Sequence, residues 1–218
     1  MEDESIYETT LCRDVGSSVD GQLLADFVKT SPGDQLAELG TGCGEVMLQI
    51  AKATPGVKVD GLEIQEELVE IARKRVINSP VNGDARVLLG DVITPPAVMR
   101  PGSYDHVFTN PPFFKVSAGR LPPDKKRAIA RFEQRGTLAD FITCGERLLR
   151  VGGVFSLIHR AERREEIIAE LKRVKLNPTR LLPIQDNKNS ETILILMAAK
   201  KGEELPMVVE PALLIKEI

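Results

Sequence analysis

Cysteine, long apolar stretches and net charge are all scarce in this sequence, and each scarcity excludes a class of protein. The three cysteines, Cys12, Cys43 and Cys144, lie far apart without metal-ligand spacing, so we expect reduced structural thiols and no metal site. No stretch approaches the roughly 18 apolar residues that span a bilayer. Residues 1–10 lack the basic start and apolar core of a secretory signal. These absences predict a cytoplasmic protein without a membrane span.

The net charge is only −3, which is not the signature of a bulk nucleic-acid binder. The charge is unevenly distributed, however, because residues 115–135 carry seven basic side chains against two acidic ones. A solvated basic helix face is the plain structural interpretation of such a run. The 218 residues, 42% hydrophobic and 28% charged, suit one globular domain over 1–218. We expect an N-terminal entry segment and helix within 1–33 and a basic insertion at 115–136.

Short apolar runs rich in β-branched residues alternate with helical patterns, which is typical of a parallel sheet with helices on both faces. We predict strands at residues 35–39, 57–62, 85–89, 104–109, 154–159, 181–184 and 192–199. We predict helices at residues 21–29, 45–53, 66–78, 138–150 and 161–172. The fold class is therefore α/β, and the tail from Lys200 onward receives no assignment. In an open sheet of this kind, ligands bind at the carboxyl ends of the strands.

The strongest local signal is the run from Glu38 to Gly44, which reads Glu-Leu-Gly-Thr-Gly-Cys-Gly between a predicted strand and a predicted helix. Its glycines let the backbone turn sharply and approach a ligand closely. The nicotinamide pattern G-x-G-x-x-G is absent, because Glu45 stands at its last glycine position. Carboxylates on both sides of the turn, Glu38 and Glu45, disfavour a pyrophosphate. They favour a cationic ligand such as S-adenosylmethionine, which carries a sulfonium and an ammonium.

Two further carboxylates follow the neighbouring predicted strands. Glu63 comes at the end of the second strand, where a carboxylate can accept two hydrogen bonds from a ribose diol. Asp91 follows the third strand and can reach an adenine amino group, with Val92 or Ile64 beside the ring. Each carboxylate alone is equally consistent with a surface group or a helix cap. Together with Glu38 they put acidic groups at the ligand edge of three adjacent strands, which favours a binding site.

The fourth predicted strand is followed by Asn110-Pro111-Pro112-Phe113. A planar amino nitrogen is a poor nucleophile, and an enzyme assists it by accepting hydrogen bonds from both of its protons. The side-chain carbonyl of Asn110 and the backbone carbonyl of Pro111 are two such acceptors, and the proline pair fixes their direction. Phe113 offers a flat face for a stacked ring. The alternative is a rigid turn with a buried phenylalanine, but the position after the fourth strand favours a catalytic turn.

With these residues the sequence resembles the class I S-adenosylmethionine-dependent methyltransferases, and its tetrapeptide resembles their amino-methylating branch. The resemblance implies a Rossmann-like, seven-stranded sheet whose last strand, near residues 192–199, is antiparallel. It implies S-adenosyl-L-methionine as cofactor, with the methionine part near the glycine turn, the ribose on Glu63 and the adenine near Asp91. The residues assigned to the cofactor are Glu38, Gly40, Thr41, Gly42, Cys43, Gly44, Glu63, Ile64, Asp91, Val92 and Asn110. Members methylate adenine or guanine amino groups or a glutamine amide, and the tetrapeptide does not choose among them.

Looser matches resemble the bacterial tRNA adenine-amino methyltransferases that act on valine tRNA. They are residues 13–20, the pair 113–114 before the basic loop, and the pair 159–160 after the fifth strand. Because the basic loop leaves the catalytic turn directly, we expect it at the mouth of the site, holding RNA phosphates with salt-dependent affinity. The side chains assigned to RNA are Lys115, Arg120, Lys125, Lys126, Arg127, Arg131, His159 and Arg160, and Arg147, Arg150, Arg163 and Arg164 could extend them. For His159, contact with a substrate phosphate and a structural hydrogen bond are equally consistent with the sequence.

The first hypothesis is methylation of the exocyclic amino group of adenine in a tRNA, with the base turned out of its stack. Two departures from that family are Phe113, where tyrosine is usual, and Glu38, where aspartate is common. The rivals are guanine-amino methylation of ribosomal RNA, methylation of a protein glutamine or a small molecule, and a binding module without catalysis. Only about 33 residues precede the first strand, which counts against the glutamine enzymes with their N-terminal helical domain.

Overall fold

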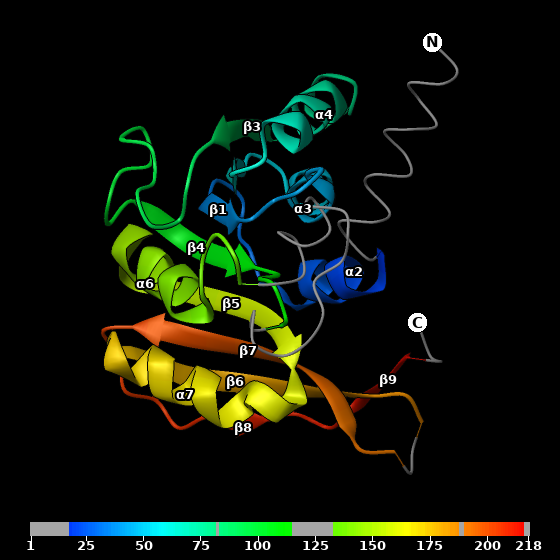
Figure 1. The fold of residues 1–218 in the computed structure, drawn as a ribbon, viewed down its shortest axis with the longest axis vertical. Coiled ribbons are helices and arrows are strands. Elements are labelled where there is room, and N and C mark those ends of the chain that lie inside the picture. Colours follow the sequence, from blue (N-terminus) through cyan, green and yellow to red (C-terminus); the bar gives the residue numbers. More distant parts are fainter. Residues whose placement is uncertain (1–17, 82, 115–132, 188–189, 216–218) are drawn as a thin grey trace.

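The computed structural model describes residues 18–81, 83–114, 133–187 and 190–215, and its centre is one twisted sheet (Figure 1). The strands are β1 (Gln35–Leu39), β2 (Lys58–Glu63), β3 (Asp84–Leu89), β4 (Tyr104–Thr109), β5 (Leu149–Arg160), β6 (Leu176–Gln185), β7 (Thr192–Lys201), β8 (Val208–Val209) and β9 (Leu213–Leu214). Their order across the sheet is β3-β2-β1-β4-β5-β7-β6-β8, and β9 also pairs with β6. Strands β1 and β4 are therefore adjacent in the sheet although β2 and β3 lie between them in the sequence.

Strand direction follows the expected pattern. Strands β1 to β5 pair in parallel, and β7 runs antiparallel to both β5 and β6. Parallel neighbours need a crossover, and helices connect β1 to β2, β2 to β3 and β4 to β5. The Rossmann-like α/β fold with seven main strands and an antiparallel last strand is confirmed. The tail, which had no assignment, adds the two short strands β8 and β9 to the edge of β6.

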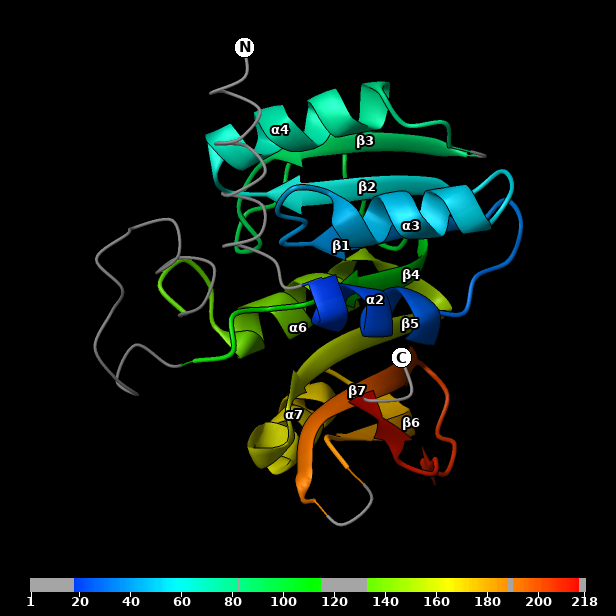
Figure 2. The same ribbon diagram turned by 90° about the vertical axis from the view of Figure 1, so that its right-hand side faces the viewer.

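Helices cover both faces of this sheet, as Figure 2 shows from the side. One face carries α2 (Ser18–Phe27), α3 (Glu45–Ala53) and α4 (Glu66–Ile77), and the other carries α6 (Leu138–Leu148) and α7 (Arg164–Arg173), preceded by the short helix η2 (Ala161–Arg163). Helix α6 begins at a capping box, in which the Thr137 hydroxyl accepts the Asp140 N–H and the Asp140 carboxylate accepts the Thr137 N–H. Among the described helices, none has the length and apolar character that crossing a bilayer requires.

The core lies on both sides of the central strands, because parallel strands under two helix layers are buried on both faces. Leu36 and Phe108 belong to the apolar cluster beneath α2 and α3, and both are 0% exposed. Leu39 and Val107, on the same two strands, belong to the cluster beneath α6 and α7. This alternation of side chains fixes the register of β1 against β4, and thereby the level at which the two strands end.

The fifth strand starts earlier than the sequence indicates. The helix predicted over residues 138–150 ends at Leu148, and β5 begins at once at Leu149 instead of at residue 154. The ammonium of Lys201 donates to the carbonyls of Glu146 and Leu149 at 2.7 and 2.9 Å. It therefore satisfies carbonyls that a helix end leaves without partners. Likewise β6 begins at Leu176 instead of residue 181, because it pairs with β7 over its whole length.

Candidate active site

The glycine turn, residues 38–44, forms a tight loop between β1 and α3. Its glycines all have positive φ angles: Gly40 72°, Gly42 56° and Gly44 77°. Residues with a Cβ are strained in this region, so the loop requires glycine. The N–H groups of Gly40 and Thr41 both donate to the Leu62 carbonyl, at 2.8 and 3.0 Å. The turn is therefore anchored to the end of the neighbouring strand β2.

Glu38 is the buried carboxylate at the base of this turn, with only 2% of its surface exposed. Its Oε2 accepts hydrogen bonds from the Thr41 hydroxyl at 2.6 Å and the Met47 N–H at 3.1 Å. Burial raises the pKa of Glu38 to about 8, and the nearby carboxylates Glu63 and Glu45 act in the same direction. A cation beside Glu38 would favour its ionised form, so the site is suited to a positively charged ligand.

Glu63 ends β2 and is held by three backbone N–H groups. Gly42 donates to Oε2 at 2.9 Å, and Ile64 and Gln65 donate to Oε1 at 3.0 and 2.9 Å. Burial raises the pKa of Glu63, while these three hydrogen bonds oppose the shift. A carboxylate offers about four lone-pair directions. The carboxylate is therefore fixed in orientation and still able to accept a hydrogen bond from a ligand.

Both carboxylates and the glycine turn open onto one cavity at the carboxyl edge of β1, β2, β3 and β4. Among the residues assigned to a cofactor from the sequence, those that line it are Glu38, Gly40, Thr41, Gly42, Cys43, Glu63, Ile64, Val92 and Asn110. The fold therefore gathers segments from four strand ends around one space.

Pattern reasoning missed several lining residues that lie far from the motifs in sequence. Phe141 lies on α6, and Gly136 precedes the same helix; Arg135 also lines the cavity, as expected for the basic run 115–135 at the mouth of the site. A Cβ added to Gly40 or to Gly136 would lie 3.3 or 3.2 Å from the Phe141 ring. Phe141 therefore forms a wall against the glycine turn. The only sequence signal for it was its place on the apolar face of a helix, which does not distinguish a core residue from a wall.

Asp91, Gly44 and Cys43 were also assigned to the cofactor from the sequence, and each has a different place in the structure. Asp91 does not line the cavity, and its Oδ1 accepts the Ile93 N–H at 2.8 Å. Gly44 lies behind the lining and is the N-cap of α3. Cys43 is disulfide-bonded, which corrects the expectation of a reduced thiol, since distance along the chain is no guide to distance in the fold. Cys144 is a free, buried thiol.

The predicted catalytic turn, residues 110–113, leaves the sheet at the end of β4, beside the glycine turn. Thr109 and Leu39 are paired in register, and the Thr109 hydroxyl also donates to the Leu39 carbonyl at 2.7 Å. Asn110 and Pro112 line the same cavity as the glycine turn. The two turns are therefore neighbours that share one ligand space, although their sequences are widely separated.

Phe113 continues the turn toward β5. Its ring lies 5.0 Å from the ring of His159, with the two planes tilted by 42°. The His159 side chain is 0% exposed. This burial favours the structural hydrogen bond over phosphate contact, the two interpretations that the sequence left open for this histidine.

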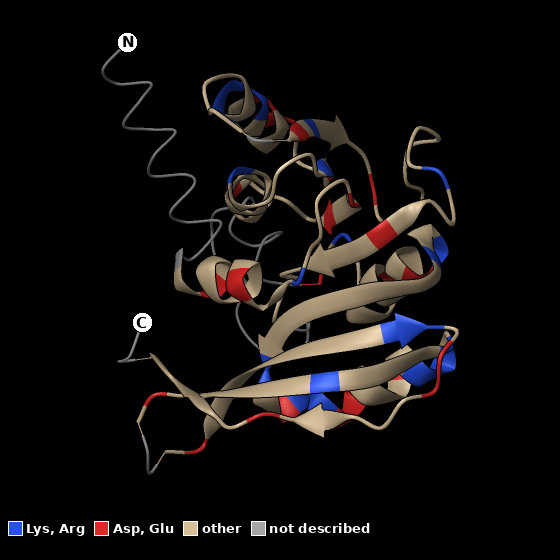
Figure 3. Cartoon of the chain, turned by 180° about the vertical axis from the view of Figure 1, so that it is seen from behind, with Lys and Arg blue, Asp and Glu red and all other residues tan. Residues whose placement is uncertain are grey.

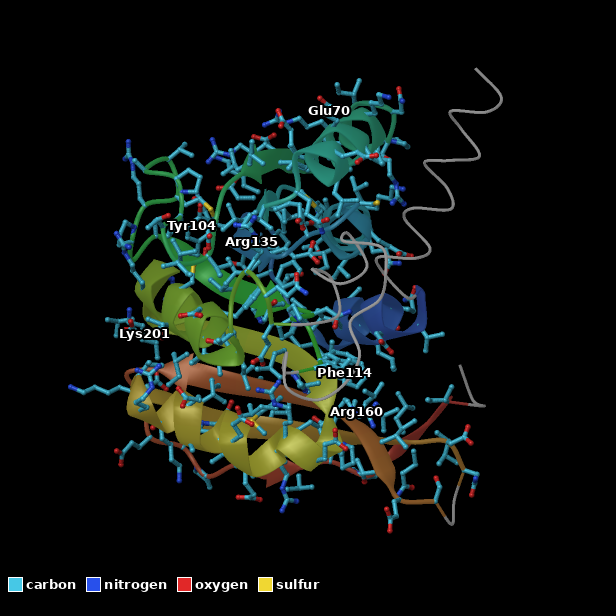
Figure 4. All side chains as sticks on the ribbon, in the orientation of Figure 1. Glu70, Tyr104, Phe114, Arg135, Arg160 and Lys201 are labelled. Atoms are coloured by element: carbon cyan, nitrogen blue, oxygen red, sulfur yellow. The ribbon has the colours of Figure 1, made fainter. Side chains whose placement is uncertain are left out.

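The basic side chains expected to contact RNA are only partly described. Lys115, Arg120, Lys125, Lys126, Arg127 and Arg131 lie outside the described residues. Arg160 ends β5 at the ligand edge, and its guanidinium lies 5.4 Å from the centre of the Phe114 ring (Figure 4). It also pairs with Glu162 at 3.0 Å. Arg160 is thus next to the catalytic turn, within reach of a substrate that enters there.

Two of the arginines that could have extended this basic surface lie at the opposite edge of the sheet. Arg150, near the start of β5, pairs with Asp105 near the start of β4 at 2.5 Å. Arg147 lies in the last turn of α6, just before β5 begins. The basic end of β7 lies at this same edge, as the blue segments of Figure 3 show. Arg147 and Arg150 therefore cannot join a surface around the catalytic turn.

The other two arginines follow β5, and they differ in exposure. Arg163 is buried and pairs with Glu133 at 2.6 Å and with Glu166 at 2.8 Å. Arg164 is exposed and pairs with Glu165 at 2.7 Å. Arg163 is therefore an internal connection between segments, and only Arg164 keeps its place beside Arg160 as a candidate for phosphate contact.

The arrangement defines what the cavity can do. Two buried carboxylates suit a ligand with a cationic group and hydroxyls, and the glycine turn admits it close to the backbone. Asn110 and Pro112 of the Asn-Pro-Pro turn, which follows the adjacent strand, line the same space. Within the described residues, no group of three or more His, Cys, Asp or Glu side chains is placed to hold a metal ion. The site is thus built for organic groups that carry positive charge and N–H donors.

Comparison with known proteins finds relatives that carry a common name. The tRNA1(Val) (adenine(37)-N6)-methyltransferase of Porphyromonas gingivalis is 28% identical over 183 residues, which cover 81% of this chain and 71% of the relative. The protein of the same name from Flavobacterium psychrophilum is 25% identical over 204 residues, which cover 92% and 84%. The similarity therefore extends over most of each protein.

Solved structures share the fold, and a family model matches the sequence. A predicted O-methyltransferase from Agrobacterium tumefaciens has a TM-score of 0.73 at 23% identity, covering 89% of this chain and 86% of that one. A geranyl diphosphate C-methyltransferase from Streptomyces coelicolor has a TM-score of 0.62 at 14% identity, covering 84% and 80%. The model of the methyltransferase small domain matches residues 13–174, which include both turns. The chain therefore belongs to the methyltransferase small domain family.

Proposed function

We propose that this protein is an S-adenosylmethionine-dependent N-methyltransferase that methylates the exocyclic amino group of adenine in a tRNA. One observation carries the proposal: Asn110, which begins the Asn-Pro-Pro-Phe turn, lines the same cavity as Glu38 and Glu63. A methyl donor bound by the carboxylates and an amino acceptor bound by the turn would meet in that space. The names of the relatives, tRNA adenine-N6 methyltransferases, support adenine as the acceptor.

The cavity fits S-adenosyl-L-methionine by the chemistry of its lining. Glu38 would pair with the ammonium, and its raised pKa supports this, because a buried carboxylate ionises readily only beside a cation. Glu63 would accept from the ribose hydroxyls, and Ile64 and Val92 would flank the adenine. When bound, the cofactor supplies a methyl group on a sulfonium, which transfers to weak nucleophiles because the departing thioether is neutral.

The catalytic turn suits a planar amino group. The Asn110 side-chain carbonyl and the Pro111 backbone carbonyl would accept hydrogen bonds from its two protons, which draws the nitrogen lone pair away from the ring. Phe113 would stack on the base once it is turned out of the helix. No strong general base is needed, because the nitrogen becomes acidic as it gains the methyl group, and its proton can pass to water. Alignment of the acceptor carries most of the rate.

Basic residues would hold the RNA around this point. Arg160 lies beside the turn, and the segment 115–132, which follows it directly in sequence, is rich in lysine and arginine. Contacts from such side chains to phosphates position a substrate without reading its sequence. We therefore expect tRNA affinity to fall steeply with salt, while cofactor affinity does not.

The test is methylation in vitro with purified protein, methyl-labelled S-adenosylmethionine and unmodified tRNA, followed by mass spectrometry of the nucleosides. The expected product is N6-methyladenosine. Asn110→Ala should bind S-adenosylhomocysteine nearly as well as the wild type and lose turnover by roughly 100-fold or more, because it removes an acceptor that acts on the reacting group. The matched control is Asn177→Ala, whose amide donates to the Glu203 carbonyl on the exposed surface at 2.9 Å; it should keep full activity.

Each alternative gives a different result when ribosomal RNA or a cell extract replaces the tRNA in this assay. Methylguanosine in ribosomal RNA in place of methyladenosine would identify guanine as the acceptor. Label that survives ribonuclease treatment would identify a protein or a small molecule as the acceptor. An Asn110→Ala variant with wild-type turnover would refute the role of the turn. If calorimetry detects no binding of S-adenosylhomocysteine, methyl transfer itself is refuted.

A further inference from the structure

His159 is a buried side chain that touches the catalytic turn without lining the cavity. It is the penultimate residue of β5, which runs parallel to β4 with Leu157 paired to Thr109. Because β5 continues beyond that pair while β4 ends, its last residues run alongside the turn. The His159 ring is 0% exposed and lies 5.0 Å from the ring of Phe113.

The hydrogen bonds of this ring define its tautomer. Nδ1 accepts the N–H of Arg160 at 2.8 Å, so it carries no proton. The Pro112 backbone also lies close enough to act on the ring as a hydrogen-bonding group that favours its charged form. Proline has no N–H, so the group bonded must be the Pro112 carbonyl, and the donor must be the other ring nitrogen, Nε2. The ring is therefore a neutral imidazole that donates to the turn and is itself held by β5.

Proline geometry explains why this one bond matters. In Asn-Pro-Pro-Phe, each proline fixes its own φ, and the residue before a proline is restricted in ψ. Asn110 and Pro111 both precede a proline, so their ψ angles are restricted. Pro112 precedes Phe113, which is not a proline, so its ψ is not restricted in this way. That angle sets the direction of the Pro112 carbonyl and of the Phe113 ring.

We propose that His159 is a positioning residue that fixes the Asn-Pro-Pro-Phe turn, by donating from Nε2 to the Pro112 carbonyl and by supporting the Phe113 ring; this inference rests on the proposed function of the turn. It acts through Phe113, on which the acceptor base would stack, and does not touch the substrate. The role differs from the phosphate contact that the sequence also allowed.

Burial and a nearby positive charge keep the His159 ring neutral. Burial, followed by the guanidinium of Arg163, lowers the pKa of His159 to about 3, and Glu166 opposes the shift. One guanidinium nitrogen of Arg163 lies 3.4 Å from Nε2; because a guanidinium can only donate, this long contact is not a hydrogen bond when Nε2 carries the proton. Arg163 is itself paired with Glu133 and Glu166. Arg160, another charged residue next to the ring in sequence, pairs with Glu162 and lies near the Phe114 ring.

The same cluster ties the turn to the segment that follows it. The Glu133 N–H donates to the Phe114 carbonyl at 2.9 Å, and the Glu133 carboxylate binds Arg163 at 2.6 Å. The chain therefore returns to the catalytic turn where residue 133 begins, next to the helix after β5. This connection holds Phe114, and through it the end of the turn, against the elements that carry His159.

The decisive comparison is between His159→Gln and His159→Asn. A glutamine amide nitrogen reaches about where Nε2 lies and can still donate to Pro112, whereas an asparagine reaches only to the place of Nδ1. We expect His159→Asn to lower the single-turnover rate of methyl transfer at saturating tRNA by roughly 10-fold. We expect His159→Gln to recover most of that rate. The KM for tRNA and the affinity for S-adenosylhomocysteine should change little in either variant.

His106 offers a matched control, because it is the other histidine of the chain and is also buried. It lies in β4 and forms a hydrogen bond with Ser156 of β5 at 2.8 Å, away from the catalytic turn. His106→Asn should lose stability without loss of rate. Equal rates for His159→Asn and the wild type would overturn the proposal. So would a His159→Gln variant that folds but is as slow as His159→Asn, because the donated hydrogen bond would then have no effect.

A second measurement does not depend on the variants folding. With two histidines in the chain, nitrogen NMR of histidine-labelled protein should show one ring, assigned to His159, that stays neutral with its proton on Nε2 from about pH 5 to pH 8. A proton on Nδ1, or a charged ring in that range, overturns the proposal. If the wild type methylates no RNA, the proposed function fails, whereas this spectrum still decides whether the ring holds the turn.

Discussion

Raising the pH should tighten the binding of S-adenosylhomocysteine, because the carboxylate that would receive its ammonium is partly protonated in the free protein. Glu38 is fully buried, and its pKa is raised to about 8 by burial and by the nearby charges of Glu63 and Glu45. Two hydrogen bonds, from Thr41 and Met47, oppose the shift without cancelling it. Only the ionised carboxylate can form an ion pair, so protonation competes with the ligand.

The magnitude follows from the fraction ionised. For a group with a pKa of about 8, that fraction rises from roughly 1% near pH 6 to roughly 50% near pH 8, so affinity should rise by about 50-fold over this interval and level off above it. Near pH 7, binding should release close to one proton, since most of the free protein must lose a proton from Glu38 to form the ion pair.

Isothermal titration calorimetry can measure both effects. The affinity is determined across this pH range, and the heat is compared in phosphate and Tris, whose ionisation enthalpies differ, to count released protons. Glu38→Gln is the control, because it keeps a hydrogen-bonding side chain but has no proton to release. It should show no pH dependence in this window and bind roughly 10- to 100-fold more weakly than the wild type near pH 8. An affinity that is flat with pH in the wild type, with no proton release, would refute the reasoning.

The same carboxylate predicts how the ligand-free protein responds to pH. The pKa of Glu38 in the folded protein, about 8, is above the ordinary value of 4.5. Protonated Glu38 therefore makes a favourable contribution to the free energy of unfolding that is complete below about pH 4.5 and is lost as the pH rises through about 8. Between these values the free energy of unfolding should fall by up to about 1.4 kcal/mol per pH unit. The melting temperature of the wild type should fall faster across this window than that of Glu38→Gln. Identical pH profiles would show that Glu38 is not the buried acid described above.

Two further substitutions test the frame around the site. Gly40→Ala should lower the free energy of unfolding by about 1–2 kcal/mol and weaken the binding of S-adenosylhomocysteine, because φ is 72° and the new Cβ lies 3.3 Å from the Phe141 ring. The control Gly33→Ala, with φ 87° and no atom near the new Cβ, should lower stability without affecting binding. Equal binding of S-adenosylhomocysteine by both variants would show that the ligand does not approach Gly40 closely. Tyr104→Phe, which removes a donor 2.6 Å from Asp60, should cost about 1–2 kcal/mol in urea denaturation without changing turnover, and unchanged stability would show that this hydrogen bond has no net value.

The parts of the site that sequence could predict are those attached to strand ends. Glu38, Glu63 and Asn110 each follow or end a short apolar run, and parallel strands bring their carboxyl ends to one edge. Their convergence on one cavity therefore required only the correct order of neighbouring strands. The glycine turn was equally visible, because positive φ angles at Gly40 and Gly42 demand glycine at fixed positions.

The remaining parts depend on packing between distant segments, which leaves no local pattern. Phe141 reads as an ordinary apolar position of a helix, yet it walls the cavity because α6 lies over the glycine turn. The pair of Arg163 with Glu133 joins residues 30 apart across a buried contact, and each residue alone resembles a surface charge. For His159 the sequence showed only that the residue ends a predicted strand. Its burial in the fold favours a structural hydrogen bond over phosphate contact, and burial of this kind cannot be read from the sequence.

The distance between the two halves of the proposed reaction is set by the register of two strands. Leu39 and Thr109 are paired in β1 and β4, and the Thr109 hydroxyl bonds to the Leu39 carbonyl as both strands end. The glycine turn and the catalytic turn therefore leave the sheet at one level, about one strand spacing of 4.8 Å apart. A slip of one residue in β4 would move Asn110 along the edge and also send Phe108 to the opposite face of the sheet, out of the core. The hydrophobic pattern that stabilises the sheet is thus the same feature that holds donor and acceptor in line, and a variant that loosens this register should lose turnover before it loses cofactor binding.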